Sequence, residues 1–278
     1  MTTQAKIDSY RIGTLAHKLR MLRFFLGRTR PATMVNMLVF KERATGAFSG
    51  QSGWQAAQAF LREMDRVQRD LGWRNVWTGK VQLQLLGDSS PVFEVVSLIE
   101  YPSPRALLSL LVSDADMSGR DAGLLGQVYL ASTTRQEAGS VPTPVNEPAD
   151  LDPQDLAAQL GVSAERFQAL MAFPADEPIE LVELLRYDEP GDIPDLSTDG
   201  LRWSGDVNQV LMGDWESPFH RMAITRCLGP RGVLSAMARE RPGVCDRWAY
   251  MATPLSVFGQ DRRRTSNAIA SNHASQSV

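Results

Sequence analysis

The chain has 278 residues, of which 43% are hydrophobic and 22% charged, and its formal net charge is −3. This length accommodates two domains with a core each, and the small negative charge gives no electrostatic footprint for a nucleic-acid partner. No run of about 18 apolar residues is present to span a membrane, and two cysteines without metal-type spacing favour a reducing, cytoplasmic location.

Residues 1–33 form a basic amphipathic arm. Apolar residues recur at three- and four-residue steps from Ile12 to Leu26, which predicts a helix with one apolar stripe. Residues 11–30 carry six Lys or Arg and no acid. Two interpretations are open: the stripe packs on the protein or on a second subunit, which is the more common use of such a helix, or residues 11–30 lie on an anionic membrane surface.

Residues 34–136 show the pattern of one ferredoxin-like domain, with the order β-α-β-β-α-β. The apolar periodicity and the turn-forming residues between the segments define its elements. The expected elements are a strand over Met34–Phe40, a helix over Trp54–Leu71, strands over Val76–Leu86 and Val92–Ile99, a helix from Ser103 to about Val112 and a strand over Gln127–Ser132.

Residues 137–178 are expected to form a linker whose second part, 152–171, has helical patterning, and residues 179–260 form a second ferredoxin-like domain. This second unit lacks its first helix, because a stretch rich in Pro, Asp and Gly follows its first strand. We expect the linker helix to cover the patch of sheet left bare. The polar residues 261–278 are expected to be a disordered tail.

The two units share an alignable segment. Residues 77–109 and 203–235 match without a gap at an offset of 126, with 11 of 33 positions identical. The first strands match at an offset of 147, so 147 − 126 = 21 residues, the length of the missing helix, separate the two offsets. Two copies at so long a spacing indicate a duplicated domain and not a solenoid.

Several short motifs carry a family resemblance. In the first unit they are MVNMLVFK from Met34, Trp77-x-Gly, Leu86-Gly-Asp, Glu100-Tyr-Pro-Ser and Arg120-x-x-Gly-Leu-Leu. With these motifs the unit resembles the uncharacterised small domains, of unknown function, of the dimeric α/β-barrel superfamily. The second unit is similar through RWSGDVNQVLMGD from Arg202 and FPADEPI from Phe173. It departs where Glu183 replaces Asn, where Arg226-Cys-Leu replaces Glu-Tyr-Pro, and where the Arg-x-x-Gly run is absent.

The resemblance implies an α+β fold in which two fused ferredoxin-like units form one dimeric α/β-barrel-type body within a single chain. Members of the superfamily include cofactor-free monooxygenases, polyketide cyclases, lactone isomerases and haem enzymes. The fold therefore leaves the chemistry open.

Two pairs of equivalent positions are candidate catalytic residues. Glu94 and His220 match because 94 + 126 = 220, and a carboxylate and an imidazole facing one cavity can divide general acid and base work. Asn36 and Glu183 match because 36 + 147 = 183, and an amide can polarise a carbonyl oxygen while a carboxylate takes a proton. The alternative is that Glu94 and His220 are solvated polar residues at the starts of strands.

Four further residues are candidates for substrate binding: Trp77, Trp203, Arg120 and Tyr129. The two tryptophans would line an apolar pocket, although matched strand tryptophans more often belong to a core. Arg120 would bind an anionic group, or instead pair with a neighbouring aspartate. Tyr129 is a phenol donor on the last strand of the first unit.

The sequence shows no metal-type cluster, phosphate-binding loop or redox-cofactor motif, so we expect no metal and no cofactor. The favoured function is a cofactor-independent enzyme that isomerises or cyclises an apolar carbonyl compound inside the barrel. Two alternatives remain open: a non-catalytic protein that binds a ligand or assembles on a membrane or partner, and a cofactor-free monooxygenase.

Overall fold

A computed structural model describes most of the chain. The described residues are 31–88, 92–103, 106, 118–146, 152–189, 191, 193–212 and 219–255. The basic arm up to residue 30, the helix expected after Ser103 (except for residue 106, which is helical), and the tail all lie outside them.

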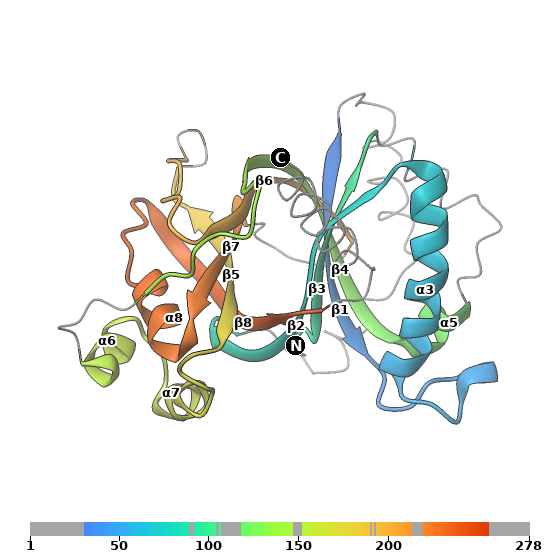
Figure 1. Ribbon diagram of the computed structural model, residues 1–278, viewed down its shortest axis with the longest axis horizontal. Coiled ribbons are helices and arrows are strands. Elements are labelled where there is room, and N and C mark those ends of the chain that lie inside the picture. Colours follow the sequence, from blue (N-terminus) through green and yellow to red (C-terminus); the bar gives the residue numbers. More distant parts are fainter. Residues whose placement is uncertain are drawn as a thin grey trace, which may run out of the picture.

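Eight antiparallel strands form a closed barrel in the order β1-β3-β2-β8-β5-β7-β6-β4 (Figure 1). Their bounds are β1 Ala32–Phe40, β2 Arg74–Leu86, β3 Val95–Tyr101, β4 Leu124–Glu137, β5 Pro178–Tyr187, β6 Leu201–Met212, β7 Arg221–Leu228 and β8 Val244–Pro254. The expected strands are confirmed, and β1 begins two residues before the expected strand start at Met34. The protein is thus α+β, with an antiparallel sheet.

Each half of the chain contributes four neighbouring strands, in the orders β4-β1-β3-β2 and β8-β5-β7-β6. The two sets join at both sides, where β2 pairs with β8 and β4 pairs with β6. Both joints are antiparallel and complete a ring, so neither half keeps a free sheet edge at these strands.

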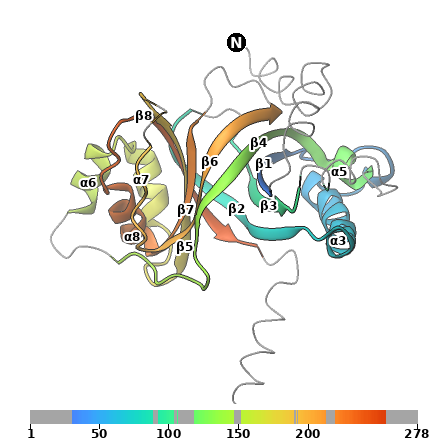
Figure 2. The same cartoon turned by 90° about the horizontal axis from the view of Figure 1, so that it is seen from above.

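The helices lie outside the barrel, in two groups at opposite sides (Figures 1 and 2). The first group is α3 (Gly53–Leu71) and α5 (Ser118–Gly123), with a short 3-10 turn η1 (Gly46–Phe48) nearby, and the second is α6 (Pro153–Gln159), α7 (Ala164–Met171) and α8 (Gly229–Met237). The described helices include none that is long and apolar enough to cross a membrane.

The single helix expected over 152–171 is wrong, because the segment forms two helices. Gly161 adopts a left-handed φ of 77°, which ends the first helix, and the Ser163 hydroxyl caps the second by accepting from the Arg166 N–H. Asp152 caps α6 in the same way, accepting from the N–H of Gln154 at 2.7 Å.

The expectation that this segment covers the bare sheet is confirmed. Leu156 of α6 and Leu170 of α7 share one buried apolar cluster with Ile179 and Leu181 of β5 and with Met251 of β8. Between β5 and β6 the described residues contain no helix, as expected. The linker helices and α8 therefore form the outer layer of the second half.

One apolar cluster fills the barrel and draws on both halves. It includes Val35 and Met37 of β1, Val182 of β5, Met222 of β7 and Tyr250 of β8. Because side chains alternate across a strand, the residues between these positions point outward to the helices. The two halves thus share one core.

The Trp-x-Gly motif has a packing explanation in both halves. Each indole lies over the glycine two residues later on its own strand, Trp77 over Gly79 and Trp203 over Gly205. A Cβ on Gly205 would lie 2.5 Å from the Trp203 ring and 2.5 Å from the Ser132 hydroxyl oxygen. Both tryptophans are buried in the barrel core. The glycine of the motif therefore leaves room for the large indole ring.

We therefore expect Gly205→Ala to lower the free energy of unfolding by about 1–3 kcal/mol, since the added methyl must displace the indole. Chemical denaturation of the two proteins measures the difference. Gly139→Ala is the matched control, because a Cβ there meets nothing within 4 Å. Equal losses in both variants would contradict the packing explanation.

Candidate functional site

Glu94 and His220 perform one and the same structural task. The Glu94 carboxylate accepts the backbone N–H of Phe40 at 2.8 Å, and the Nδ1 atom of His220 accepts that of Tyr187 at 3.0 Å. Phe40 and Tyr187 are the last residues of β1 and β5. Each side chain thus holds the end of a first strand.

These positions do not form the expected acid–base couple. Glu94 is exposed, and the described residues include no hydrogen bond or ion pair between it and His220. Because its Nδ1 accepts a backbone proton, the neutral His220 ring carries its own proton on Nε2. Glu94 is therefore better described as a solvated polar residue at the start of a strand than as a catalytic residue.

The two tryptophans are enclosed in the barrel. The Trp203 indole donates to the Thr134 hydroxyl at 3.2 Å, and that hydroxyl lies 2.9 Å from the hydroxyl of Thr33. Trp77 is also buried, and none of the described residues forms a hydrogen bond with its indole nitrogen. Neither ring lies on the sheet face where the other candidate residues meet.

Three of the candidate residues do meet, on the outer face of the first half. Asn36 lies between barrel-facing Val35 and Met37, so it points to the helix side. In the pairing of β1 with β4, Asn36 lies directly opposite Tyr129. Residues opposite each other in an antiparallel pair have Cβ atoms about 4.5–5.5 Å apart.

Arg120 completes this outer-face cluster. Its guanidinium donates to the Gln127 amide oxygen at 3.0 Å and to the Tyr129 phenol oxygen at 3.2 Å. The expected pairing with a neighbouring aspartate also exists, at 3.6 Å to Asp121, but that carboxylate is mostly exposed. Since exposed ion pairs stabilise little, the contacts to Gln127 and Tyr129 fix the arginine.

Close backbone packing sets the position of Arg120. A Cβ on Gly123 would meet backbone atoms of Gly53 and Ala57 in α3, and a Cβ on Gly119 would lie 2.7 Å from the Ala56 carbonyl oxygen. Two glycines therefore let α5 lie directly against α3. Arg120, between them, is held over β4.

Two members of the cluster were missed from the sequence, Ser97 and Gln127. The Asn36 amide donates to the Ser97 hydroxyl at 3.2 Å, and both Ser97 and Gln127 are buried. Gln127 lies two residues before Tyr129 in a strand, so the period-two rule places both on one face. This spacing could have identified Gln127 from the sequence. Ser97 lies on a separate strand, and no sequence pattern links it to the cluster.

The surroundings of the cluster are apolar. Met34, Trp73 and Tyr101 form a buried patch on the same face, with Phe60 of α3 and Tyr129 packed against it. Burial, with Tyr129 nearby, raises the pKa of the Tyr101 phenol, although Arg120 opposes the shift. Hydrogen-bond donors in such a low-dielectric setting act strongly on an oxygen of a ligand.

The second half has ions at the corresponding place. Glu183 is fully buried on the outer face of β5, and it accepts from Arg241 at 3.2 Å and from Arg247 in a shorter contact. Arg247 lies opposite Leu185, as Gln127 lies opposite Leu38 in the first half. Glu183 is therefore engaged on the far side of the barrel from Asn36, and the two do not share a site.

Glu180 is a buried carboxyl that the sequence reasoning did not select. It shares a strand face with Val182, which lies in the barrel core, and its Oε1 accepts from Arg202 at 3.0 and 2.9 Å. Its Oε2 has no hydrogen-bond partner in the part of the chain that the structure describes. Burial raises the pKa of Glu180, while Arg202 and Arg226 oppose the shift.

Within the described part of the chain, no group of three or more His, Cys, Asp or Glu is placed to hold a metal ion. The outer-face cluster offers a guanidinium, two amides, a phenol and a hydroxyl. These groups bind and polarise oxygen atoms of a ligand, and the phenol can also move a proton.

No protein-family model matches the chain, and no curated protein matches it. Among solved structures, a protein of unknown function from Rhodopseudomonas palustris is similar with 24% identity over 41% of this chain and 90% of its own, at a TM-score of 0.38. Chlorite dismutase from Candidatus Nitrospira defluvii is similar with 10% identity over 86% of this chain and 98% of its own, at 0.41. A candidate monooxygenase from Lactobacillus acidophilus has 9% identity over 81% and 94%, at 0.38. These identities are too low to indicate a shared activity.

The strand-end role of Glu94 predicts which of its substitutions matter. Glu94→Ala removes the acceptor of the Phe40 N–H and should lower the free energy of unfolding by about 0.5–1.5 kcal/mol. Glu94→Gln keeps an acceptor oxygen and should change it by less. Urea denaturation compares the two, and equal losses would contradict this role.

Glu180 predicts a dependence of stability on pH. Its folded-state pKa is raised, so the folded protein holds the proton more tightly than the unfolded chain does. That contribution is present below the unfolded value of about 4.3 and is lost as the pH rises through the folded value. The wild type should lose stability relative to Glu180→Gln from about pH 4 upward, measured by denaturation across this range. Parallel profiles would contradict the assignment.

Proposed function

We propose that the chain is a small-molecule enzyme that moves a proton on an apolar carbonyl compound, as an isomerase or cyclase, at the outer-face cluster of the first half. The observation that carries the proposal is the contact of the Arg120 guanidinium with the Tyr129 phenol oxygen, directly opposite Asn36. The location differs from the barrel interior that we expected from the sequence, because apolar side chains fill the barrel.

Each residue has a role that its chemistry supports. The Asn36 amide polarises the substrate carbonyl oxygen, and it retains donor capacity because one of its two N–H groups suffices for Ser97. Tyr129 is the group that moves the proton: it takes one from the carbon next to the carbonyl and returns it to another carbon of the resulting enolate. The Arg120 guanidinium holds the Tyr129 oxygen by its hydrogen bond and favours negative charge on that oxygen. One proton moves and no electrons are gained or lost.

We also infer that the two halves are tandem ferredoxin-like units of the dimeric α/β-barrel type, of which the second has lost its first helix. The repeated Trp-x-Gly packing, the matching strand-end contacts of Glu94 and His220, and the like strand order of both halves support this inference. A duplicated scaffold is free to specialise one half, here the half with Asn36.

Tyr129→Phe tests the proposed reaction. With the full chain in D2O, NMR follows deuterium uptake at the carbon next to the carbonyl in a panel of apolar ketones and lactones. General acid–base groups contribute about 10²–10⁴-fold, so the variant should lose at least 100-fold of the exchange rate, roughly the lower bound. Arg120→Met should lose rate as well, since it removes the hydrogen bond that holds the Tyr129 oxygen.

Tyr250→Phe is the matched control, because it also removes a tyrosine hydroxyl, but from the barrel core. The control should keep its exchange rate. Exchange that survives in Tyr129→Phe would overturn the proposal. Binding of panel compounds without exchange would favour the non-catalytic ligand-binding alternative. Consumption of dissolved oxygen with a panel compound would favour the monooxygenase alternative.

A further inference from the structure

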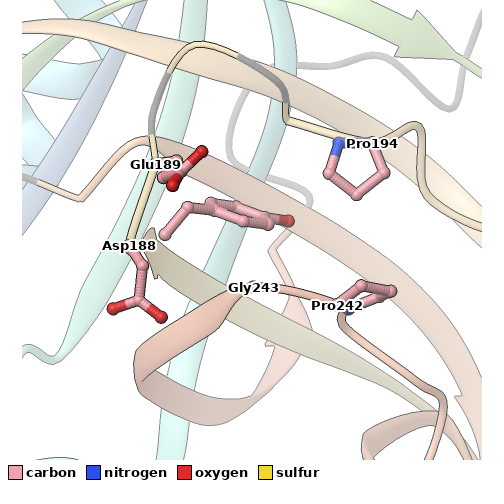
Figure 3. Close-up of a pocket in the computed structure, with 6 residues that line it drawn as sticks. Asp188, Glu189, Pro194, Pro242 and Gly243 are labelled. Carbon is pink, nitrogen blue, oxygen red and sulfur yellow. The ribbon is translucent and has the colours of Figure 1, made fainter.

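A pocket of about 480 Å³ opens on the second half, where the chain between β5 and β6 takes the place of a helix (Figure 3). Its lining residues are Tyr187, Asp188, Glu189, Pro194, Pro242 and Gly243. Pockets of small-molecule ligands are typically about 300–1,000 Å³, so the volume suits a compact organic molecule. It lies apart from the outer-face cluster, on the other half of the chain.

The charge of the lining is wholly negative. Asp188 and Glu189 supply the two charged side chains, and both are exposed. Neither carboxylate takes part in an ion pair or side-chain hydrogen bond among the described residues. Figure 3 shows the two acids on the same side of the pocket, with Pro194 and Pro242 across from them. Free carboxylates beside apolar walls favour a ligand that combines a cation with a flat apolar part.

Tyr187 adds a second, independent indication of a ligand. The residue is 3% exposed and lines the pocket, yet its phenol oxygen has no hydrogen-bond partner among the described residues. A buried polar group without a partner costs free energy, and a bound molecule would recover it. Burial also raises the pKa of this phenol, so it is neutral near pH 7 and its oxygen can accept an N–H.

The basic groups behind Tyr187 are neutralised. Arg221 donates to the Asp206 carboxylate at 3.0 and 2.7 Å, and Arg241 donates to Glu183 at 3.2 Å. Because each of these arginines already has a carboxylate partner, the free charge at the pocket is that of Asp188 and Glu189.

The walls are fixed before any ligand binds. The Asp188 N–H donates to the Gly243 carbonyl oxygen at 2.9 Å, which ties the two loops together. Arg221 donates to the carbonyl oxygen of Pro194 and holds the opposite wall. Such a preformed pocket loses little entropy on binding.

We propose that this pocket binds a small flat organic cation, an amidinium, guanidinium or aryl-ammonium compound. The cation pairs with Asp188 and Glu189, one of its N–H groups donates to the Tyr187 oxygen, and its apolar part lies between the two prolines. The ring of Tyr187 attracts the same charge by a cation–π contact. The proposal does not depend on the activity proposed for the first half.

Three probes of one shape test the proposal on the full-length chain by isothermal titration calorimetry. Benzamidine is cationic, benzamide is its neutral isostere, and benzoate is the anion. Benzamidine should bind with a Kd on the order of 1 mM or below, benzamide at least about 10-fold more weakly, and benzoate not measurably. Equal affinities for the three probes, or no binding of benzamidine, would overturn the proposal.

Variants locate the site. The double variant Asp188→Asn, Glu189→Gln should weaken benzamidine binding at least about 10-fold, and Tyr187→Phe should weaken it several-fold. Glu165→Gln, which removes an exposed carboxylate from α7, should leave binding unchanged. Circular dichroism establishes that each variant is folded. Benzamidine affinity that is undiminished in the folded double variant, or lost equally in Glu165→Gln, would refute the site.

Discussion

The pairing of β2 with β8 and of β4 with β6 is the constraint on which the rest of the structure depends. These two joints turn eight strands into a ring without a free edge, and the ring encloses a cluster to which both halves contribute. Large rings such as Trp77, Trp203 and Tyr250 occupy that interior. A core packed in this way leaves few polar groups inside the barrel, among them Glu180 with its partner Arg202, while Asn36, Gln127 and Glu183 lie on the two outer faces.

The two outer faces solve the same burial problem differently. At matching register positions, Asn36 and Gln127 in the first half are neutral, while Glu183 and Arg247 in the second carry opposite charges. The two members of a buried ion pair must remain bound to each other, because a charge without its partner is costly in a low-dielectric interior. The neutral amides bear a smaller desolvation cost and keep hydrogen-bonding capacity for a ligand. The outer face of the first half therefore keeps polar groups for a ligand, whereas the charges on the outer face of the second half are engaged with each other.

Local patterns in the sequence were sufficient for the strands, for α3 and for the absence of a helix among the described residues between β5 and β6. The side of the sheet on which a residue lies was not readable in β1, because the run MVNMLVF is apolar on both faces and Asn36 interrupts it only once. Glu94 and His220 matched as equivalent positions, but their shared role depends on backbone N–H groups far away in sequence. Glu180 was hidden for the same reason, since its partner Arg202 comes from another strand.

The loop between β5 and β6 has a consequence for binding. A helix satisfies its own backbone groups, whereas a loop must have its carbonyl and amide groups satisfied by other parts of the protein. In the second half Arg221 reaches from β7 to the Pro194 carbonyl oxygen, and Gly243 accepts from the Asp188 N–H. The loop is fixed at these points and packs on the barrel through Leu196, and the acidic pocket lies between its anchors. The second half thus has a concave surface at this loop, whereas the first half carries α3 between β1 and β2.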